Sequence, residues 1–117
     1  MSWQFKLKPR DIVQADPGYE DQKDEKVRPL LVVSRPLFHQ NGRFFISLGI
    51  TTNQEKDPYL IPITSKDTAH ILQEKSQVMC KRIVTVSQSR ILRKLTEVTP
   101  SFYSVIMKKI KDDIIEM

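Results

Sequence analysis

The chain has 117 residues with a formal net charge of +5 and a pI near 9.4; 39% of its residues are hydrophobic and 28% are charged. We expect residues 1–117 to form a single globular domain, because this composition is too apolar for a disordered chain. The lack of ~20 consecutive apolar residues excludes a membrane span, and a single cysteine rules out an internal disulfide. We therefore expect a cytoplasmic protein. Its basic charge favours acidic or polyanionic partners.

Two short apolar runs predict the first strands. They cover residues 11–15 and 29–34, and a polar loop over residues 16–26 separates them. Five of the six residues in the second run are apolar, which is typical of a strand that is buried on both faces. The loop is longer than a usual hairpin connection, and long loops in compact domains tend to be functional or disordered.

The middle of the chain predicts a turn region and three more strands. The turn region covers residues 36–42, and the strands cover residues 43–52, 59–63 and 77–86. Gly49 within the first of these strands indicates a β-bulge or a close backbone approach. Pro62 in the second predicts an edge or bulged strand, since proline has no N–H for a ladder hydrogen bond.

The last quarter predicts a turn at residues 87–90, a strand at residues 92–98 and a C-terminal helix. Thr99 and Pro100 match a helix N-cap followed by proline at the first helical position. Helical spacing predicts one buried face, made by Phe102, Val105, Ile106, Ile110 and Ile114. Several short strands with one terminal helix favour a mainly β (α+β) fold, a small and strongly bent antiparallel barrel.

The charges are unevenly distributed along the chain. Residues 16–26 hold five acidic side chains against two lysines, whereas residues 81–94 hold five basic side chains and no acidic one. The basic residues are Lys81, Arg82, Arg90, Arg93 and Lys94. Such a stretch is either a solvated face or a surface that attracts nucleic acid.

Arg28 stands at the start of the second predicted strand, and Thr51, Thr52 and Asn53 close the third. A guanidinium stays charged and offers five N–H donors in a planar fork. If the two strands pair, this cation and the hydroxyls meet at one end of the sheet, where they can hold a phosphodiester and stabilise developing negative charge. The alternatives are an arginine that ends a strand in solvent and threonines that satisfy the local backbone.

Other reactive side chains are given simpler interpretations. His39 and His70 stand apart in the sequence and are predicted to be surface residues, with a paired histidine acid and base as the alternative. Cys80 lies in an apolar strand and is predicted to be a core residue. Tyr19, in the polar loop, is a candidate for stacking on a base.

Four segments occur in a recognisable order. They are Asp-Ile-Val at residues 11–13, Arg-Pro-Leu-Leu-Val-Val-Ser at 28–34, Gly-Ile-Thr-Thr-Asn at 49–53, and Ile-Val-Thr-Val at 83–86 followed by Ser-Arg-Ile-Leu-Arg-Lys-Leu at 89–95. In order and spacing the chain resembles the PemK/MazF family, the ribosome-independent endoribonuclease toxins of type II toxin–antitoxin modules. The resemblance spans nearly the whole chain, and it implies an SH3-like barrel with a C-terminal helix, usually assembled as a homodimer.

The resemblance also implies an activity. Family members cleave single-stranded RNA without a metal or cofactor: the 2′-hydroxyl attacks the adjacent phosphate and leaves a cyclic phosphate end. The family's motifs assign catalysis to Arg28 and Thr51 and imply a cognate antitoxin whose acidic tail fills the RNA groove. The residues predicted to contact RNA are Thr52, Asn53, Lys81, Arg82 and Tyr19.

The proton acceptor for the 2′-hydroxyl stays unassigned. Arg28 cannot serve, because the pKa of a guanidinium lies above about 12, and the Thr51 hydroxyl is a poor base. Glu20, Asp21 and Asp24 are candidates, because closure of their loop over RNA can bring a carboxylate to the site. The alternative is that all three are solvated loop residues.

The chain departs from the family's pattern at several positions. Some relatives have an Arg-x-Asp pair on the fifth strand, where this chain has Met79 and Lys81. Other relatives have a glutamine followed two residues later by an arginine, where this chain has Arg82 and Val84. Arg10 stands where glycine is common in the family. The residues Met79 and Lys81 favour an alternative, a catalytically silent RNA- or antitoxin-binding module on the same fold. A further alternative is a gyrase-inhibiting toxin of related fold whose C-terminal helix engages a protein target.

Overall fold

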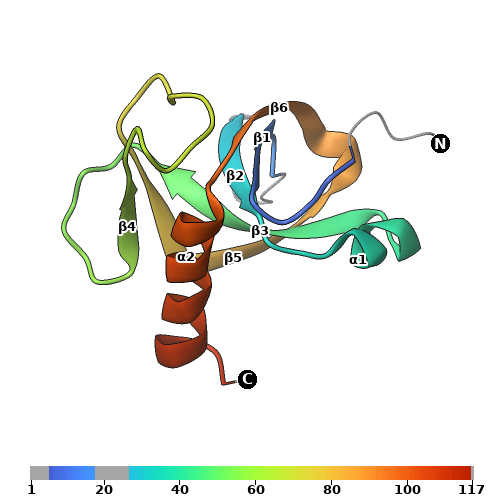
Figure 1. Ribbon diagram of the computed structural model, residues 1–117. Helices are drawn as coiled ribbons and strands as arrows, with labels where there is room; N and C mark the ends of the chain where they lie inside the picture. The colour runs from blue at the N-terminus through green and yellow to red at the C-terminus, as the bar shows by residue number, and fades with distance from the viewer. Residues whose placement is uncertain (1–5, 18–26, 117) are drawn as a thin grey trace.

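The computed structural model describes residues 6–17 and 27–116, and in this part six strands form one antiparallel sheet (Figure 1). The strand order is β4-β5-β3-β2-β1-β6. The elements are β1 (Asp11–Ala15), β2 (Arg28–Val32), α1 (Pro36–Asn41), β3 (Phe44–Thr51), β4 (Leu60–Ile63), β5 (Ser76–Ser87), the 3₁₀ turn η1 (Gln88–Arg90), β6 (Ile91–Glu97) and α2 (Pro100–Asp113). This bent sheet with a C-terminal helix confirms the predicted mainly β architecture.

The sheet buries side chains on both of its faces. One cluster, which includes Leu31, Leu48 and Ile106, fills the space between the sheet and α2. The other, which includes Leu30 and Val32, lies on the opposite face of the strands. Because neighbouring residues of β2 enter different clusters, the prediction that this strand is buried on both faces is confirmed.

The helix α2 begins and packs nearly as predicted. The Thr99 hydroxyl oxygen accepts a hydrogen bond from the Phe102 N–H, and Pro100 occupies the first turn. Phe102, Ile106 and Ile110 are buried, but Val105 is 54% exposed, so its predicted place in the buried face is wrong. Successive helical residues point about 100° apart, and Val105 therefore falls beside the stripe that contacts the sheet.

The predicted turn region at residues 36–42 is instead the short helix α1. Pro36 lies in its first turn, where a missing N–H costs no hydrogen bond, and Gly42 is its C-cap residue. Proline and glycine are signals for turns as well as for helix ends. The sequence signal was therefore correct for the boundaries and wrong for the segment between them.

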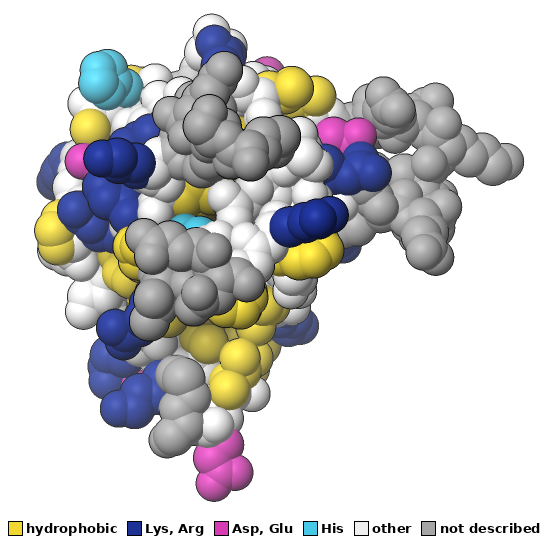
Figure 2. Space-filling view, turned by 90° about the vertical axis from the view of Figure 1, so that its right-hand side faces the viewer, with side chains coloured by type: hydrophobic (Ala, Val, Ile, Leu, Met, Phe, Trp, Pro, Cys, Tyr) yellow, Lys and Arg dark blue, Asp and Glu magenta, His cyan; other side chains and the backbone are white. Residues whose placement is uncertain are grey.

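The basic stretch at residues 81–94 does not form one surface. Arg90 pairs with Asp16 at 3.2 Å, Lys94 pairs with Asp11 at 3.1 Å, and the Arg93 Nε donates to the Gln14 side chain. Arg90 directly precedes β6 and the other two residues lie on it, and β6 pairs with β1, whereas Lys81 and Arg82 belong to β5 on the far side of β3. On the face that Figure 2 shows, Lys and Arg side chains accordingly lie in several separate groups.

No helix in the described ranges is long and apolar enough to cross a membrane.

Candidate nucleic-acid interface

The pairing of β2 with β3 places Arg28 and Thr51 on one face of the sheet. The paired residues of β2 and β3 end at Leu30 and Gly49, and Arg28 and Thr51 each lie two residues beyond this pair, at the same end of the two strands. Side chains alternate between faces along a strand, so Arg28 lies on the face of Leu30 and Thr51 on the face of Gly49. That the cation and the hydroxyl act together at this end of the sheet stays a prediction.

The Arg28 side chain has a buried donor that no group in residues 6–17 and 27–116 satisfies. Its Nε is buried and makes no hydrogen bond within the described part of the chain. A buried polar group left unsatisfied costs about 1–3 kcal/mol. An anion bound at the guanidinium would remove this penalty.

Gly49 lets two side chains of β5 lie against the β3 backbone. A β-bulge separates the pair Leu48–Ile83 from the pair Gly49–Met79. A Cβ on Gly49 would lie 2.6 Å from the Met79 Cε and 3.4 Å from the Arg82 Cδ. Both alternatives predicted for this glycine, a bulge and a close approach, are therefore present, and together they bring the Arg82 stem beside β3.

A cavity of about 380 Å³ opens between the segment after β3 and the bulged part of β5; we call it the Thr51 cavity. Its polar lining consists of Thr51, Asn53, Glu55, Asp57, Lys81 and Arg82. Tyr59, Leu60 and Met79 supply the more apolar walls. A larger cavity of about 520 Å³ on residues 54–58, Leu60, Pro62 and Gln77 includes none of the residues that the sequence predicted for the site.

The segment that follows Thr51 is held by hydrogen bonds. The Thr51 Oγ1 accepts from the Asn53 N–H at 3.1 Å, which leaves the hydroxyl hydrogen to be donated. The side-chain amide of Gln77, which is 6% exposed, donates to the carbonyl oxygens of Asn53 and Glu55 at 2.8 and 3.0 Å. Because Gln77 pairs with Thr51 in the sheet, it ties this segment to the end of β3.

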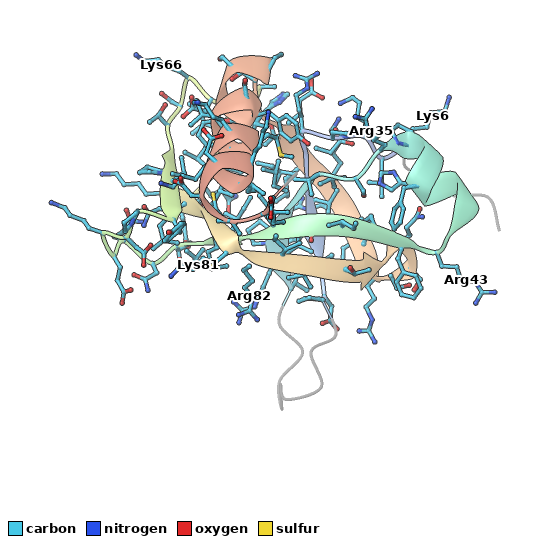
Figure 3. All side chains as sticks on the ribbon, turned by 90° about the horizontal axis from the view of Figure 1, so that it is seen from below. Lys6, Arg35, Arg43, Lys66, Lys81 and Arg82 are labelled. Atoms are coloured by element: carbon cyan, nitrogen blue, oxygen red, sulfur yellow. The ribbon has the colours of Figure 1, made fainter. Side chains whose placement is uncertain are left out.

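Lys81 and Arg82 lie next to each other on β5, apart from Lys6, Arg35 and Arg43, as Figure 3 shows. The Lys81 ammonium lies 4.7 Å from the centre of the Tyr59 ring, and the Lys109 ammonium lies 5.1 Å from the same ring. Cations at these distances are attracted to the ring face. Tyr59 therefore gathers positive charge at the edge of the Thr51 cavity.

The predicted contact residues divide into three groups. Asn53, Lys81 and Arg82 line the Thr51 cavity with Thr51 itself, whereas Arg28 and Thr52 are not among its lining residues. The Thr52 carbonyl instead accepts from the Gln54 side chain. The predictions for Tyr19, Glu20, Asp21 and Asp24 fall outside the described residues.

His39 is 8% exposed, so the prediction that it is a surface residue is wrong, while His70 is exposed as predicted. The imidazole contacts the Leu7 carbonyl through Nδ1 and the Ser34 hydroxyl through Nε2. Burial lowers the pKa of His39 below its ordinary value. The ring is a structural link between α1 and the sheet, a role that depends on distant contacts and leaves no signal in the local sequence.

Cys80 is buried in the cluster under α2, as predicted. Burial raises the pKa of its thiol to about 11, and a thiol that stays protonated is a poor nucleophile. Among the described residues, no group of three or more His, Cys, Asp or Glu side chains is arranged to hold a metal ion.

Sequence reasoning missed Tyr59, Glu55 and Gln77. Tyr59 reaches Lys81 because the next residue, Leu60, pairs with Met79 across the β4–β5 ladder. Gln77 reaches the segment after β3 because it pairs with Thr51. Both contacts depend on strand registers that nothing in a single sequence reveals.

A family model for PemK-like, MazF-like toxins of type II toxin–antitoxin systems matches residues 8–113. The chain belongs to this family. No curated protein matches the sequence.

Solved structures of MazF-like proteins share the fold. MazF from Deinococcus radiodurans superposes with a TM-score of 0.75 at 14% identity, covering 92% of this chain and 94% of that one. An endoribonuclease from a mycobacterial species superposes with a TM-score of 0.68 at 18% identity, and the match covers 97% of this chain and 91% of that one. A mycobacterial endoribonuclease in complex with its cognate antitoxin superposes with a TM-score of 0.68 at 20% identity, and the match covers 92% of this chain and 90% of that one.

The structure shows what two departures from the MazF-like pattern change, one at Met79 and Lys81 and the other at Arg10. Met79 and Lys81, at the positions of the Arg-x-Asp pair, both line the Thr51 cavity, so their exchange changes its charge and its walls. Arg10 has a φ of 85°, in the left-handed region where a side chain costs about 1–2 kcal/mol and glycine costs less. This backbone conformation explains physically why a glycine suits the position.

Proposed function

We propose that this toxin-family protein is an endoribonuclease that acts in the cytoplasm on single-stranded RNA, mRNA in particular, and inhibits growth until its cognate antitoxin binds it. The proposal is supported by the pairing of β2 with β3, which puts Arg28 and Thr51 on one face of the sheet, each two residues beyond the paired Leu30 and Gly49, and by a cavity that Thr51 shares with Lys81 and Arg82. Cations attract the RNA backbone, and donors at the reacting phosphate stabilise its transition state.

The proposed reaction is an internal displacement at phosphorus. The 2′-oxygen of the ribose attacks the adjacent phosphate, the bond to the 5′-oxygen of the next nucleotide breaks, and a 2′,3′-cyclic phosphate and a 5′-hydroxyl result. Arg28 neutralises charge on the pentacoordinate phosphate, and the Thr51 hydroxyl donates to one of its oxygens. The 2′-hydroxyl proton passes to a carboxylate, for which Glu20 and Asp21 are the proposed acceptors, the departing 5′-oxygen takes up a proton from water, and no metal or cofactor takes part.

The partners follow from the same arrangement of charges. Mycobacterial and Deinococcus relatives have been crystallised with their antitoxins. We propose that an acidic segment of a cognate antitoxin competes with RNA for Arg28, Lys81 and Arg82, because both ligands carry negative charge. A homodimer, usual in the family, is the proposed assembly, with Thr52, Asn53 and Tyr19 as further RNA contacts.

The test is cleavage of a fluorogenic single-stranded RNA by the purified protein in the presence of a chelator. We expect a 2′,3′-cyclic phosphate product, no cleavage of the same RNA carrying a 2′-deoxyribose at the scissile position, and a loss of about 10²–10³-fold in rate for Arg28→Ala. Arg43→Ala, which removes a distant cation, is the matched control and keeps the rate.

Two outcomes would overturn the proposal. Binding of RNA without cleavage by the wild-type protein would instead support the catalytically silent module. Cleavage that survives Arg28→Ala, with the fold intact by circular dichroism, would move the reaction to another site.

A further inference from the structure

The Thr51 cavity contains two carboxylates, Glu55 and Asp57, which a site for phosphate alone would not need. Like charges repel, so these side chains weaken phosphate binding unless they face a different part of the ligand. A nucleotide has such a part, because its base carries N–H donors. The mixed lining of the cavity therefore matches a whole nucleotide better than a phosphate group.

Glu55 is presented to the cavity from a fixed backbone. Its N–H donates to the Asn53 Oδ1 at 2.8 Å, and its carbonyl accepts from the buried Gln77 amide at 3.0 Å. These bonds anchor the residue from two sides, independently of any ligand. The backbone of Glu55 is thus held at the rim of a cavity that Thr51 and Arg82 also line.

The two carboxylates differ in what they already bind. The Asp57 Oδ1 accepts from the Tyr59 N–H at 2.7 Å and closes a turn. Within the described residues the Glu55 carboxylate makes no hydrogen bond or ion pair. Both of its oxygens remain available to a ligand.

The walls and size of the cavity suit a base. Tyr59, Leu60 and Met79 supply apolar surface, and about 380 Å³ lies at the small end of the range for ligand pockets. Such a space accepts one nucleotide, with its phosphate toward the cations Lys81 and Arg82 and its base against the apolar walls.

We propose that Glu55 reads a guanine next to the scissile phosphate, so that the substrate is single-stranded RNA cut beside guanine. Guanine is the RNA base with two adjacent N–H donors, N1–H and the N2 amino group, and these match the two oxygens of a carboxylate. Glu55 is a specificity-determining residue, and the proposal rests on the proposed endoribonuclease activity.

The test compares synthetic RNAs that differ at this one base. The wild-type protein is expected to lose about tenfold in kcat/KM when the guanine is replaced by inosine, which lacks the N2 amino group. It is expected to keep its rate with 7-deazaguanine, whose N1–H and N2 amino group are intact. Glu55→Gln abolishes the difference between guanine and inosine, whereas Glu74→Gln, outside the cavity, preserves it.

The contrary outcomes separate the two proposals. Equal wild-type rates on guanine and inosine RNAs at every flanking position would overturn the role of Glu55 and leave the endoribonuclease proposal intact. A loss of rate in Glu55→Gln on all sequences, together with loss of the acidic limb of the pH–rate profile, would make Glu55 the proton acceptor and also overturn it. Absence of any wild-type cleavage would overturn both proposals.

Discussion

Arg28 combines two properties that a purely structural arginine lacks. Its Nε is buried without a partner in the part of the chain that the structure describes, and Arg28 lies on the same face of the sheet as Thr51, two residues beyond the pair Leu30–Gly49. An unsatisfied donor is a cost in the free protein, and ligand binding recovers it. Arg28 therefore contributes more to a complex with an anion than to the stability of the fold.

Replacing Arg28 with lysine tests whether the planar fork is needed. Arg28→Lys keeps the charge but cannot make two parallel N–H···O bonds to one phosphate. We expect kcat/KM for RNA cleavage to fall by at least about tenfold, while the free energy of unfolding in urea changes by less than about 1 kcal/mol. Cleavage by the Arg28→Lys variant at the wild-type rate would show that charge alone suffices.

The elements that could be predicted from sequence are those specified by local signals. β1 has its predicted bounds because apolar residues fill it, and α2 begins at Pro100 because the Thr99 cap and the proline are adjacent in sequence. α1 was missed because Pro36 and Gly42 also suit turns, and the burial of His39 depends on Leu7 and Ser34. Thr51 and Asn53 were predicted from the segment that closes β3, and Lys81 and Arg82 from the basic stretch. Glu55, Tyr59 and Gln77 required the strand registers.

The close approach of Met79 to Gly49 at the β5 bulge allows a test by substitution of this glycine. In Gly49→Ala the new Cβ meets the Met79 Cε, the flexible end of its side chain, so the fold survives with a loss of less than about 2 kcal/mol in the free energy of unfolding. Met79 must move within the Thr51 cavity, and we expect a raised KM for RNA. Steady-state kinetics with urea unfolding as the stability control measures both; an unchanged KM would mean that Met79 does not border the bound RNA.

Ion pairs join the edge strand β6 to β1 and to the residues just before it. The Glu97 carboxylate accepts hydrogen bonds from Lys8 and from Lys94, and these cations lower its pKa from the ordinary value of 4.5 to about 2. A carboxyl with a lower pKa in the folded state stabilises the fold above its unfolded pKa, and this contribution disappears as the pH falls toward the folded value. Lys94, a residue of the basic stretch that was a candidate for attracting RNA, therefore forms ion pairs within the protein instead.

Glu97→Gln tests this contribution. The variant should be less stable than the wild-type protein at pH 7, and the difference should shrink as the pH falls from about 4.5 toward 2. Urea unfolding at pH 7 and pH 3 measures the difference at each pH. The same difference at both pH values would show that Glu97 keeps an ordinary pKa.

The most direct measurement of whether Arg28 and Thr51 act on one phosphate is a double-mutant cycle with Arg28→Ala and Thr51→Val. Each single variant should lose RNA cleavage, and the double variant should lose less than the product of the two single losses, because groups that serve one transition state are not additive. Thr51→Ser, which keeps the hydroxyl, should retain most of the activity. Losses that multiply independently, or a single variant as active as the wild-type protein, would contradict a shared site.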